Sequence, residues 1–337
     1  MLSIDPVSIF LFTAICLILY VSSYGAKRAS HKFPPGPIPL PLIGNLHMIN
    51  MRKPCLTLME LSKKYGSIFS VQLGTEKIVV LCGYDTMKDA LIYHADEFSE
   101  RSKIPIAEHI VKGNGIVSAH GENWKVMRRF TLSTLRNFGM GKRSLEDKIN
   151  EECDCLVETF QFYKGLPFDN SILLNAAFAN IIVSILIGHR FDYQDPTLLK
   201  LLYLINENFR IFGSQATMVY NMYPLIMKWI PGCYKALHEN TLKLYEFIEE
   251  TFTKHKDSLD INHQRDLIDV FLVKQQEEKT SGFFHDQNLT QLVADLFSAG
   301  METTSTTVRW GLLLMMKYPD IQSKREHFII QIIHIML

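Results

Sequence analysis

The stretch AGMETTSTT, Ala299 to Thr307, places a glycine, a carboxylate and five hydroxyl side chains inside a long apolar segment. Around it, apolar residues recur with the helical period from Asp286 to Lys317. Proline follows at position 319 and ends helices, so we predict one helix over 286–317. At the helical rise per residue this helix is about 48 Å long, enough to cross a domain.

The small and polar residues of this stretch weaken the helix that contains them. A glycine in a helix interior costs about 1 kcal/mol relative to alanine, and a threonine hydroxyl competes for backbone carbonyls. One interpretation is an exposed, threonine-rich helix surface on which Glu302 is solvated. The other is that Ala299 and Gly300 let a flat cofactor lie against the helix, while Glu302 and Thr303 handle protons beside it.

The rest of the chain is mainly helical by pattern. Gly66 to Gly83 alternates apolar and polar residues about a Gly-Thr-Glu-Lys break, which predicts a β-hairpin. Helical periods follow over residues 84–93, 124–138, 145–164, 172–187, 198–211 and 234–256. We therefore predict a mostly α protein with a small amino-terminal β-sheet.

The first 26 residues are predicted to form a transmembrane signal anchor. Pro6 to Ala26 carries no charged side chain and reaches roughly the 20 residues that cross a hydrocarbon core. Lys27 and Arg28 follow at once, and positive charge marks the cytosolic side, so the remaining chain is expected in the cytosol. A cleaved signal peptide fits less well, because it needs positive charge before the apolar stretch.

A proline-rich segment, residues 27–49, follows the predicted anchor. Its five prolines, at positions 34, 35, 37, 39 and 41, remove backbone donors and exclude a helix. We expect an extended, stiff hinge that leads into a catalytic body at residues 50–324. The last residues, 325–337, form an apolar tail that does not continue the pattern of that body.

Composition narrows the classes of function. The chain carries 35 basic and 35 acidic residues, which gives no reason to expect a nucleic-acid partner. Its six cysteines include no Cys-x-x-Cys pair, which favours reduced thiols over a disulfide framework. Cys153 and Cys155 would project to different sides of a helix, so no metal site is predicted from them.

Six motifs, in order along the chain, are similar to those of one enzyme family. AGMETTSTTVRW resembles the central helix motif of cytochrome P450 monooxygenases, Ala/Gly-Gly-x-Asp/Glu-Thr-Thr/Ser. FPPGPIPLPLIGN is similar to the proline-rich hinge of the microsomal members, and GENWKVMRRF to their Trp-x-x-x-Arg motif. FSERSK falls where the family places a haem-contacting arginine, and LIDVFL and KYPDIQSK resemble the microsomal family-2 group. The resemblance covers Met1 to Lys324 and implies a partial cytochrome P450 fold whose carboxy-terminal third is absent.

The resemblance implies haem as the cofactor and gives roles to particular residues. Thr303 corresponds to the threonine on the oxygen side of the haem and Glu302 to its acidic neighbour; together they would deliver protons to dioxygen at the iron. A threonine hydroxyl suits this role because it both donates and accepts. Met301 stands at the variable position of the motif. The expected haem contacts are Arg101, Trp124, Arg128, Ala299, Gly300 and Thr303.

The resemblance implies that three of these residues, Arg101, Trp124 and Arg128, bind the haem propionates, for which guanidinium and indole N–H groups are suitable donors. Without the resemblance, Arg128 would be interpreted as a solvated helix arginine and Trp124 as part of the core. The positions that correspond to pocket-lining residues of the family, or that equally belong to the core, are Phe209, Phe212, Ile116 and Val117.

Local charge and the resemblance together point to a protein partner. Six basic residues and no acidic one lie from Lys125 to Arg143. Such a run is usually a solvated face, but in the family this surface docks acidic redox partners, chiefly NADPH–cytochrome P450 reductase, and charge of this kind speeds association. The resemblance also implies the endoplasmic reticulum membrane and oxidation of small lipophilic substrates.

Two features of the family have no counterpart in the sequence. Glu207–Arg210, ENFR, matches the Glu-x-x-Arg pattern but lies well before the long helix. No cysteine follows Cys233, so the loop that carries the axial thiolate is not found. We therefore expect this 337-residue chain to be inactive as a monooxygenase. The alternatives are a non-catalytic, membrane-anchored truncated isoform, an incomplete gene model, or a remnant that binds haem through a histidine.

Overall fold

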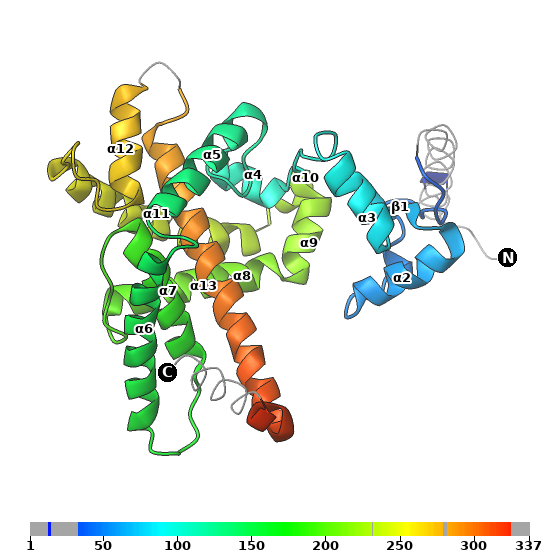
Figure 1. Ribbon diagram of the computed structural model, residues 1–337. Coiled ribbons are helices and arrows are strands. Elements are labelled where there is room, and N and C mark those ends of the chain that lie inside the picture. The colour runs from blue at the N-terminus through cyan, green and yellow to red at the C-terminus, as the bar shows by residue number, and fades with distance from the viewer. Residues whose placement is uncertain (1–12, 15–32, 231, 279–281, 325–337) are drawn as a thin grey trace. The chain divides into compact units, whose positions relative to one another are not determined.

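The computed structural model describes residues 13–14, 33–230, 232–278 and 282–324 (Figure 1). The chain divides into two compact units, the first made of Met1–Ser102 and Met218–Pro231, the second of Lys103–Thr217 and Gly232–Leu337. Almost all of the predicted anchor, and the tail 325–337, lie outside the described residues. Over the described ranges, no helix combines the length and the apolar character needed to cross a bilayer.

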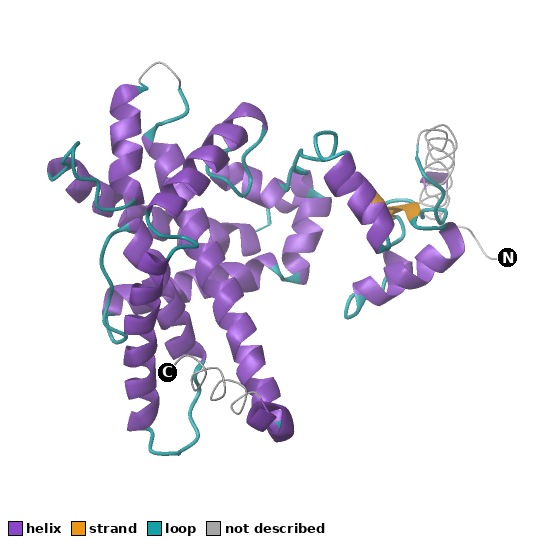
Figure 2. Cartoon of the chain, viewed as in Figure 1, coloured by secondary structure: helices purple, strands orange, loops and turns teal. Residues whose placement is uncertain are grey.

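The first unit contains the predicted β-hairpin. Strands β1 (Ile68–Leu73) and β2 (Glu76–Leu81) pair antiparallel over their whole lengths. Phe69 and Val71 are buried on one face of β1, where helix α2 (Pro54–Tyr65) covers them. The alternating pattern therefore predicted both the strands and their pairing correctly, and helices form most of the remaining described chain (Figure 2).

The proline-rich segment lies along the edge of β1 that faces away from β2. The backbone N–H of Ser70 donates to the carbonyl oxygen of Pro35 at 2.9 Å. A Cβ at Gly36 would lie 1.9 Å from the Ser70 carbonyl oxygen, so only glycine fits there. The buried side chain of Asn45 accepts the N–H of Gln72 at 2.8 Å. Residues 33–39 of the segment form no helix, as predicted, but the chain turns back at Leu40–Gly44 and residues 46–48 form a 3-10 helix, so the described part of the segment belongs to the first unit and is not a continuous stiff spacer.

The other elements of the first unit are short. They are η2 (Leu46–Met48), α3 (Tyr84–Lys88), the π-helical turn η3 (Asp89–Tyr93) and α10 (Pro224–Met227). The single helix predicted over 84–93 is thus an α-helical turn that widens into a π turn. The hydroxyl of Tyr223 donates to the Leu42 carbonyl at 2.6 Å, which fastens residues 218–231 to the hairpin side of this unit.

The second unit is a bundle of helices. Its members are α4 (Pro105–Val111), α5 (Gly121–Asn137), α6 (Arg143–Phe162), α7 (Ser171–Leu186), α8 (Pro196–Phe212), α11 (Cys233–Asp257), α12 (Leu267–Glu277) and α13 (Asp286–Lys317), and α9 (Gln215–Met222) follows α8. The helical periods in the sequence located α5 to α8 and α11 to within a few residues. Helix α12 was found in the sequence only as a family motif, and the short helices α4, α9 and α10 were not predicted.

Helix α13 has the bounds that the sequence predicts. The ring nitrogen Nδ1 of His285 accepts the N–H of Asn288 at 3.3 Å and so caps the start of the helix. Helix α7 lies along α13, as Figure 1 shows, and Gly300 lies where the two helices meet. A Cβ at Gly300 would lie 2.6 Å from Cδ1 of Ile182, so the glycine permits this approach of the two helices.

The core of the second unit forms around the first half of α13. Its buried residues there are Leu289, Leu292, Val293, Phe297 and Met301, all at most 3% exposed. Three further core rings, Phe130, Phe271 and Phe284, meet edge to face with centroids 5.1–5.4 Å apart. In the second half of the helix the large side chains are exposed, with Trp310 at 61% and Met316 at 70%.

Candidate functional site

One face of α13 carries the two residues that the sequence singles out most strongly. Ala299 and Thr303 are four positions apart, which places them on the same side of the helix, and both are exposed. The Thr303 hydroxyl donates to the Ala299 carbonyl at 2.6 Å, and the Thr307 hydroxyl donates to the Thr303 carbonyl at 2.7 Å. The helix surface at Ala299 therefore carries only a small side chain. Beside it the Thr303 hydroxyl is held in place by its bond to the Ala299 carbonyl and can still accept hydrogen bonds.

Gly300 does not share this face. It points into the contact with α7, where Ile182 leaves no space for a Cβ. The structure thus gives Gly300 a packing reason of its own, and its predicted contact with a cofactor stays a prediction.

Glu302 lies between the exposed face and the buried face of α13. Its neighbour Met301 is completely buried, whereas Thr303 is exposed. Carboxylate oxygen Oε1 of Glu302 accepts the hydroxyl of Thr306 at 3.2 Å. The other oxygen, Oε2, is buried and has no hydrogen-bond partner among the residues that the structure describes. A buried acceptor without a donor is costly, and it is a feature that a water or a ligand hydroxyl would satisfy.

Trp124 and Arg128 lie together on α5. The guanidinium carbon of Arg128 is 5.5 Å from the centroid of the Trp124 ring, within the range of a cation–π contact. Arg128 is exposed and, within the described ranges, makes no ion pair, so its N–H groups are open to an anion. Arg101 is also exposed but belongs to the first unit, so its predicted share in one site with Trp124 and Arg128 stays a prediction.

The basic residues of α5 and of the loop after it do not all present a free positive charge. Lys125 pairs with Glu122 at 2.9 Å on the same helix, which neutralises one of its charges. The cations that are exposed and form no ion pair within the described part of the chain are Arg128, Arg129, Arg136 and Lys142. A positive surface therefore remains, and it includes the arginine expected to face a propionate.

The residues expected to line a pocket fall into two groups. Phe209 and Phe212, at the end of α8, are 41% and 43% exposed. Ile116 packs against the main core, whereas its neighbour Val117 is 53% exposed. The loop that carries Ile116 and Val117 is hydrogen-bonded to the side of α13, through Asp295 at 2.8 and 3.0 Å and through Asn288 at 2.7 Å. These polar contacts were not predicted from the sequence.

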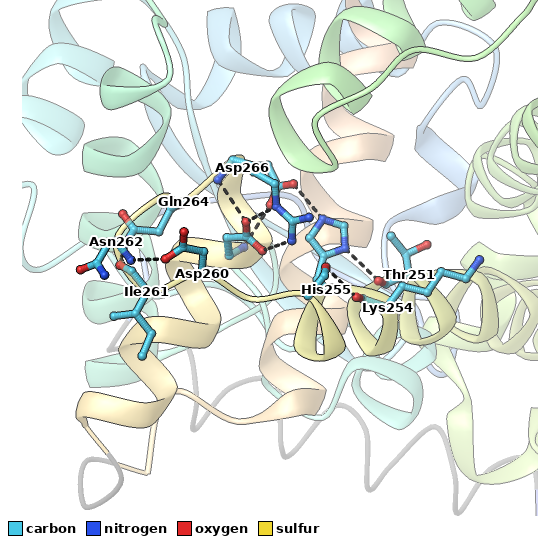
Figure 3. A network of polar contacts seen from close by, with 11 residues as sticks. Thr251, Lys254, His255, Asp260, Ile261, Asn262, Gln264 and Asp266 are labelled. Carbon is cyan, nitrogen blue, oxygen red and sulfur yellow. Dashed lines mark hydrogen bonds and ion pairs between the residues drawn. The ribbon is translucent and has the colours of Figure 1, made fainter.

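A separate cluster of titratable groups joins α11 to α12 (Figure 3). The two ring nitrogens of His255 lie 2.9 Å from the Thr251 carbonyl and 2.8 Å from Oδ2 of Asp266. Both partners are acceptors, so both nitrogens donate and the imidazole is cationic. Burial opposes this charge, but the hydrogen bonds to Asp266 and to the Thr251 carbonyl, with the negative charges of Asp266 and Asp269, together outweigh it and raise the pKa of His255.

The ligand atoms of His255, Asp266 and Asp269 lie within 4.8 Å of one another, close enough to hold a metal ion. Each of them is already engaged. Arg265 binds the Asp269 carboxylate at 2.6 and 2.9 Å, and Oδ1 of Asp266 caps α12 through the N–H of Asp269 at 3.0 Å. A guanidinium inside the cluster repels a cation. The cluster is therefore explained as an ion-pair network that fixes the connection between the two helices.

Comparison with known proteins adds the family context. Residues 34–334 match the family model described as Cytochrome P450. The chain is 44% identical over 331 residues to cytochrome P450 2C14 of Oryctolagus cuniculus, which covers 98% of this chain and 67% of the relative. It is 44% identical over 328 residues to cytochrome P450 2C8 of Homo sapiens, with coverages of 96% and 67%. Against cytochrome P450 2B4 of Oryctolagus cuniculus the identity is 42% over 311 residues, with coverages of 92% and 63%. The chain thus spans about two thirds of the length of these relatives.

Proposed function

The chain belongs to the cytochrome P450 family, and on this premise we propose that it carries the oxygen-side half of a haem monooxygenase. The proposed reaction is the oxidation of small lipophilic substrates with dioxygen and NADPH-derived electrons. The observation that supports it most directly is the exposed Ala299–Thr303 turn of α13, where a small residue and an anchored hydroxyl share one face.

Haem is the cofactor of this family, and two groups of described residues suit it. The exposed side of α13 at Ala299 offers a flat apolar surface. Trp124 and Arg128 offer N–H donors of the kind that bind carboxylates such as propionates. When bound, haem supplies the iron at which dioxygen is reduced. The proposed role of the chain is to hold the cofactor and to move protons toward that position.

Thr303 is proposed to pass protons at its hydroxyl oxygen. In the structure Oγ1 donates its proton to the Ala299 carbonyl, so its lone pairs are free to accept a hydrogen bond from water on the exposed side. Rotation of the hydroxyl then allows it to donate toward that side. Glu302 supplies a carboxylate one residue away whose Oε2 has no described partner, which suits a group that takes up and returns a proton.

The proposed partners follow from charge and from the family. The exposed arginines of α5, which form no described ion pair, suit an acidic redox partner, for which the family's NADPH-dependent reductase is the candidate. The apolar segment at residues 6–26 is proposed to anchor the chain in the endoplasmic reticulum membrane, with the body in the cytosol.

We further propose that these 337 residues alone are not an active monooxygenase. The axial thiolate of the family drives O–O cleavage. The thiols that the structure describes are Cys55, Cys82, Cys153, Cys155 and Cys233, and none of them follows α13, where the resemblance places the ligand loop. The second candidate is a non-catalytic protein that binds a redox partner through the α5 surface.

The first experiment is a reduced carbon-monoxide difference spectrum of the purified chain supplied with haem. We expect no red-shifted Soret band of the thiolate type. Such a band would show that a cysteine of this chain reaches the iron, and it would overturn the proposed inactivity.

The assignment of Thr303 is tested in a fusion of residues 1–324 to the remaining third of human cytochrome P450 2C8. Replacing Thr303 by alanine is expected to divert electrons from product to peroxide by about tenfold, within the range that loss of a proton-transfer group causes. Thr307→Ala removes a hydroxyl one turn further on and is expected to leave the ratio unchanged. Equal ratios in the two variants would contradict the role of Thr303.

A further inference from the structure

The first half of α13 carries a line of polar side chains that the proposed chemistry does not use. Asn288, Gln291 and Asp295 lie at intervals of three and four residues, so they share one side of the helix. Two of them, Asn288 and Gln291, are buried in an otherwise apolar region. Buried polar groups are costly unless they are satisfied, so their partners indicate what they do.

Asp295 holds the loop that precedes α5. Its Oδ2 accepts the backbone N–H of Ile116 at 2.8 Å and of Val117 at 3.0 Å. Asn288 adds a third bond by accepting the N–H of Gly115 at 2.7 Å. A Cβ at Gly115 would lie 2.3 Å from the Asp295 carboxylate, so the loop approaches α13 as closely as a backbone can.

This position requires a group that only accepts hydrogen bonds. Oδ2 of Asp295 meets two loop N–H groups, and Oδ1 accepts the side-chain amide of Gln291 at 2.6 Å. An asparagine would turn its own NH2 toward one of these donors. The carboxylate has no cationic partner among the described side chains that contact it, and burial raises its pKa. A buried carboxylate without a cation is retained here although it is unfavourable for stability.

The line continues into a second helix. The amide oxygen Oε1 of Gln291 accepts the hydroxyl of Tyr245, which lies on α11. Burial raises the pKa of Tyr245, so its hydroxyl keeps its proton and donates. Each hydrogen bond in this series is then donated in the same direction, from Tyr245 to Gln291 and from Gln291 to Asp295. Hydrogen bonds arranged head to tail polarise and strengthen one another.

We propose that Tyr245, Gln291 and Asp295 form a relay that positions the loop at Gly115–Val117 against α13, so that the hydroxyl of α11 fixes a loop that it does not touch. Asp295, Ala299 and Thr303 follow one another at intervals of four, so the loop is held one helical turn before the exposed turn. Asp295 is therefore a positioning residue that sets where Val117 lies beside the turn at Ala299–Thr303. What that turn does rests on the proposed function.

The relay is tested by hydrogen exchange of the purified full chain, without haem, in peptides that cover residues 113–118. Asp295→Asn is expected to speed exchange of the Ile116 and Val117 amides at least about tenfold, because hydrogen bonds to a charged acceptor are lost. Tyr245→Phe is expected to speed the same amides about two- to fivefold, because it weakens the acceptor through Gln291.

Tyr193→Phe is the matched control. Tyr193 packs against the same core as Tyr245. The substitution likewise removes a single hydroxyl hydrogen bond, here the one to Glu152. Both variants are expected to lower the melting temperature to a similar extent, but only Tyr245→Phe changes exchange at residues 113–118. Unchanged exchange in Tyr245→Phe would overturn the relay, and so would equal acceleration in Tyr193→Phe.

Should Asp295→Asn fail to fold, Gln291→Ala takes its place. It cuts the connection between Tyr245 and Asp295 and leaves the carboxylate in position, so acceleration at Ile116 and Val117 is again expected. None of these measurements depends on haem or on catalysis, so failure of the relay is distinguishable from failure of the proposed monooxygenase chemistry.

Discussion

The two halves of α13 are one continuous helix with different surroundings. From Asp286 to Met301 most of its side chains are packed by α7 and the main core, or are joined to distant backbone by buried polar contacts. From Thr303 onward most side chains are exposed, including Trp310 and the run from Leu312 to Leu314. The first half is therefore stabilised mainly by tertiary contacts, whereas the second depends more on helix propensity.

The largest expected difference between the halves is in large-to-small substitution. Leu292→Ala is expected to lower the free energy of unfolding by about 2–5 kcal/mol, because a completely buried side chain leaves a cavity. Leu313→Ala, at a position 48% exposed, is expected to change it by less than about 0.5 kcal/mol. Chemical denaturation followed by circular dichroism measures both. Equal losses would show that the second half of α13 is packed in solution.

The glycines of α13 give a closer comparison. Gly300→Ala is expected to destabilise by about 1–3 kcal/mol, because its Cβ would lie 2.6 Å from Ile182. A Cβ at Gly311 would meet no atom within 4 Å, so Gly311→Ala is expected to stabilise the helix by roughly 1 kcal/mol. Thermal unfolding reports both signs. Combining Gly300→Ala with Ile182→Ala restores room for the new Cβ and is expected to recover much of the lost stability. If the loss came from the helix itself, the second substitution would recover nothing.

The ion-pair network of His255, Asp266 and Asp269, which joins α11 to α12, adds a dependence on pH. The pKa of His255 is raised in the folded chain, so its stabilising effect is complete below the unfolded-state value near 6.5 and disappears as pH rises through the folded-state value. Loss of the charge weakens a bond to Asp266, by about 1–2 kcal/mol. Melting temperatures between pH 6 and pH 9 should therefore fall in the wild type.

A variant without the titrating ring provides the control for that measurement. His255→Gln keeps a donor for Asp266 but cannot change its charge, so its melting temperature is expected to vary less over the same range. An identical fall in the variant would assign the pH dependence to other groups.

The smallest effect is expected at the exposed end of the helix. Trp310→Ser replaces a side chain that is 61% exposed, so the melting temperature should stay within about 2 °C of the wild type, as for an average surface change in a chain of this size. A clear fall in the melting temperature would reveal a partner for this side chain that lies outside the described residues.

Much of the fold was predictable because it depends on local signals. The bounds of α13 followed from apolar period and from Pro319, and the hairpin followed from alternation about Gly74. The proline-rich segment was correctly predicted to be free of helix over residues 33–39, although the chain turns back at Leu40–Gly44. Its attachment to β1 was not predicted, because that contact depends on Gly36 and on the side chain of Asn45. In the sequence, nothing distinguishes these two residues from ordinary loop residues.

The candidate site likewise has a part that local spacing predicts and a part that it does not. The exposed face at Ala299 and Thr303 follows from the spacing of four, and so does the pairing of Trp124 with Arg128. The role of Asp295 was missed although its spacing from Asn288 and Gln291 is visible in the sequence. Its partners are backbone amides 178 and 179 positions away, and no local pattern identifies them. Long-range contacts to backbone are the part that required the structure.

The contact between the proline-rich segment and β1 has a consequence for self-association. A hairpin of two strands exposes unpaired N–H groups that can template pairing with another chain. On β1 the N–H groups of Ser70 and Gln72 are instead taken by the Pro35 carbonyl and by Asn45. Proline cannot extend a ladder, so the covering segment offers no new edge of its own. The β1 edge of the sheet is thereby blocked from pairing with a further strand by a proline-rich segment that cannot extend a ladder.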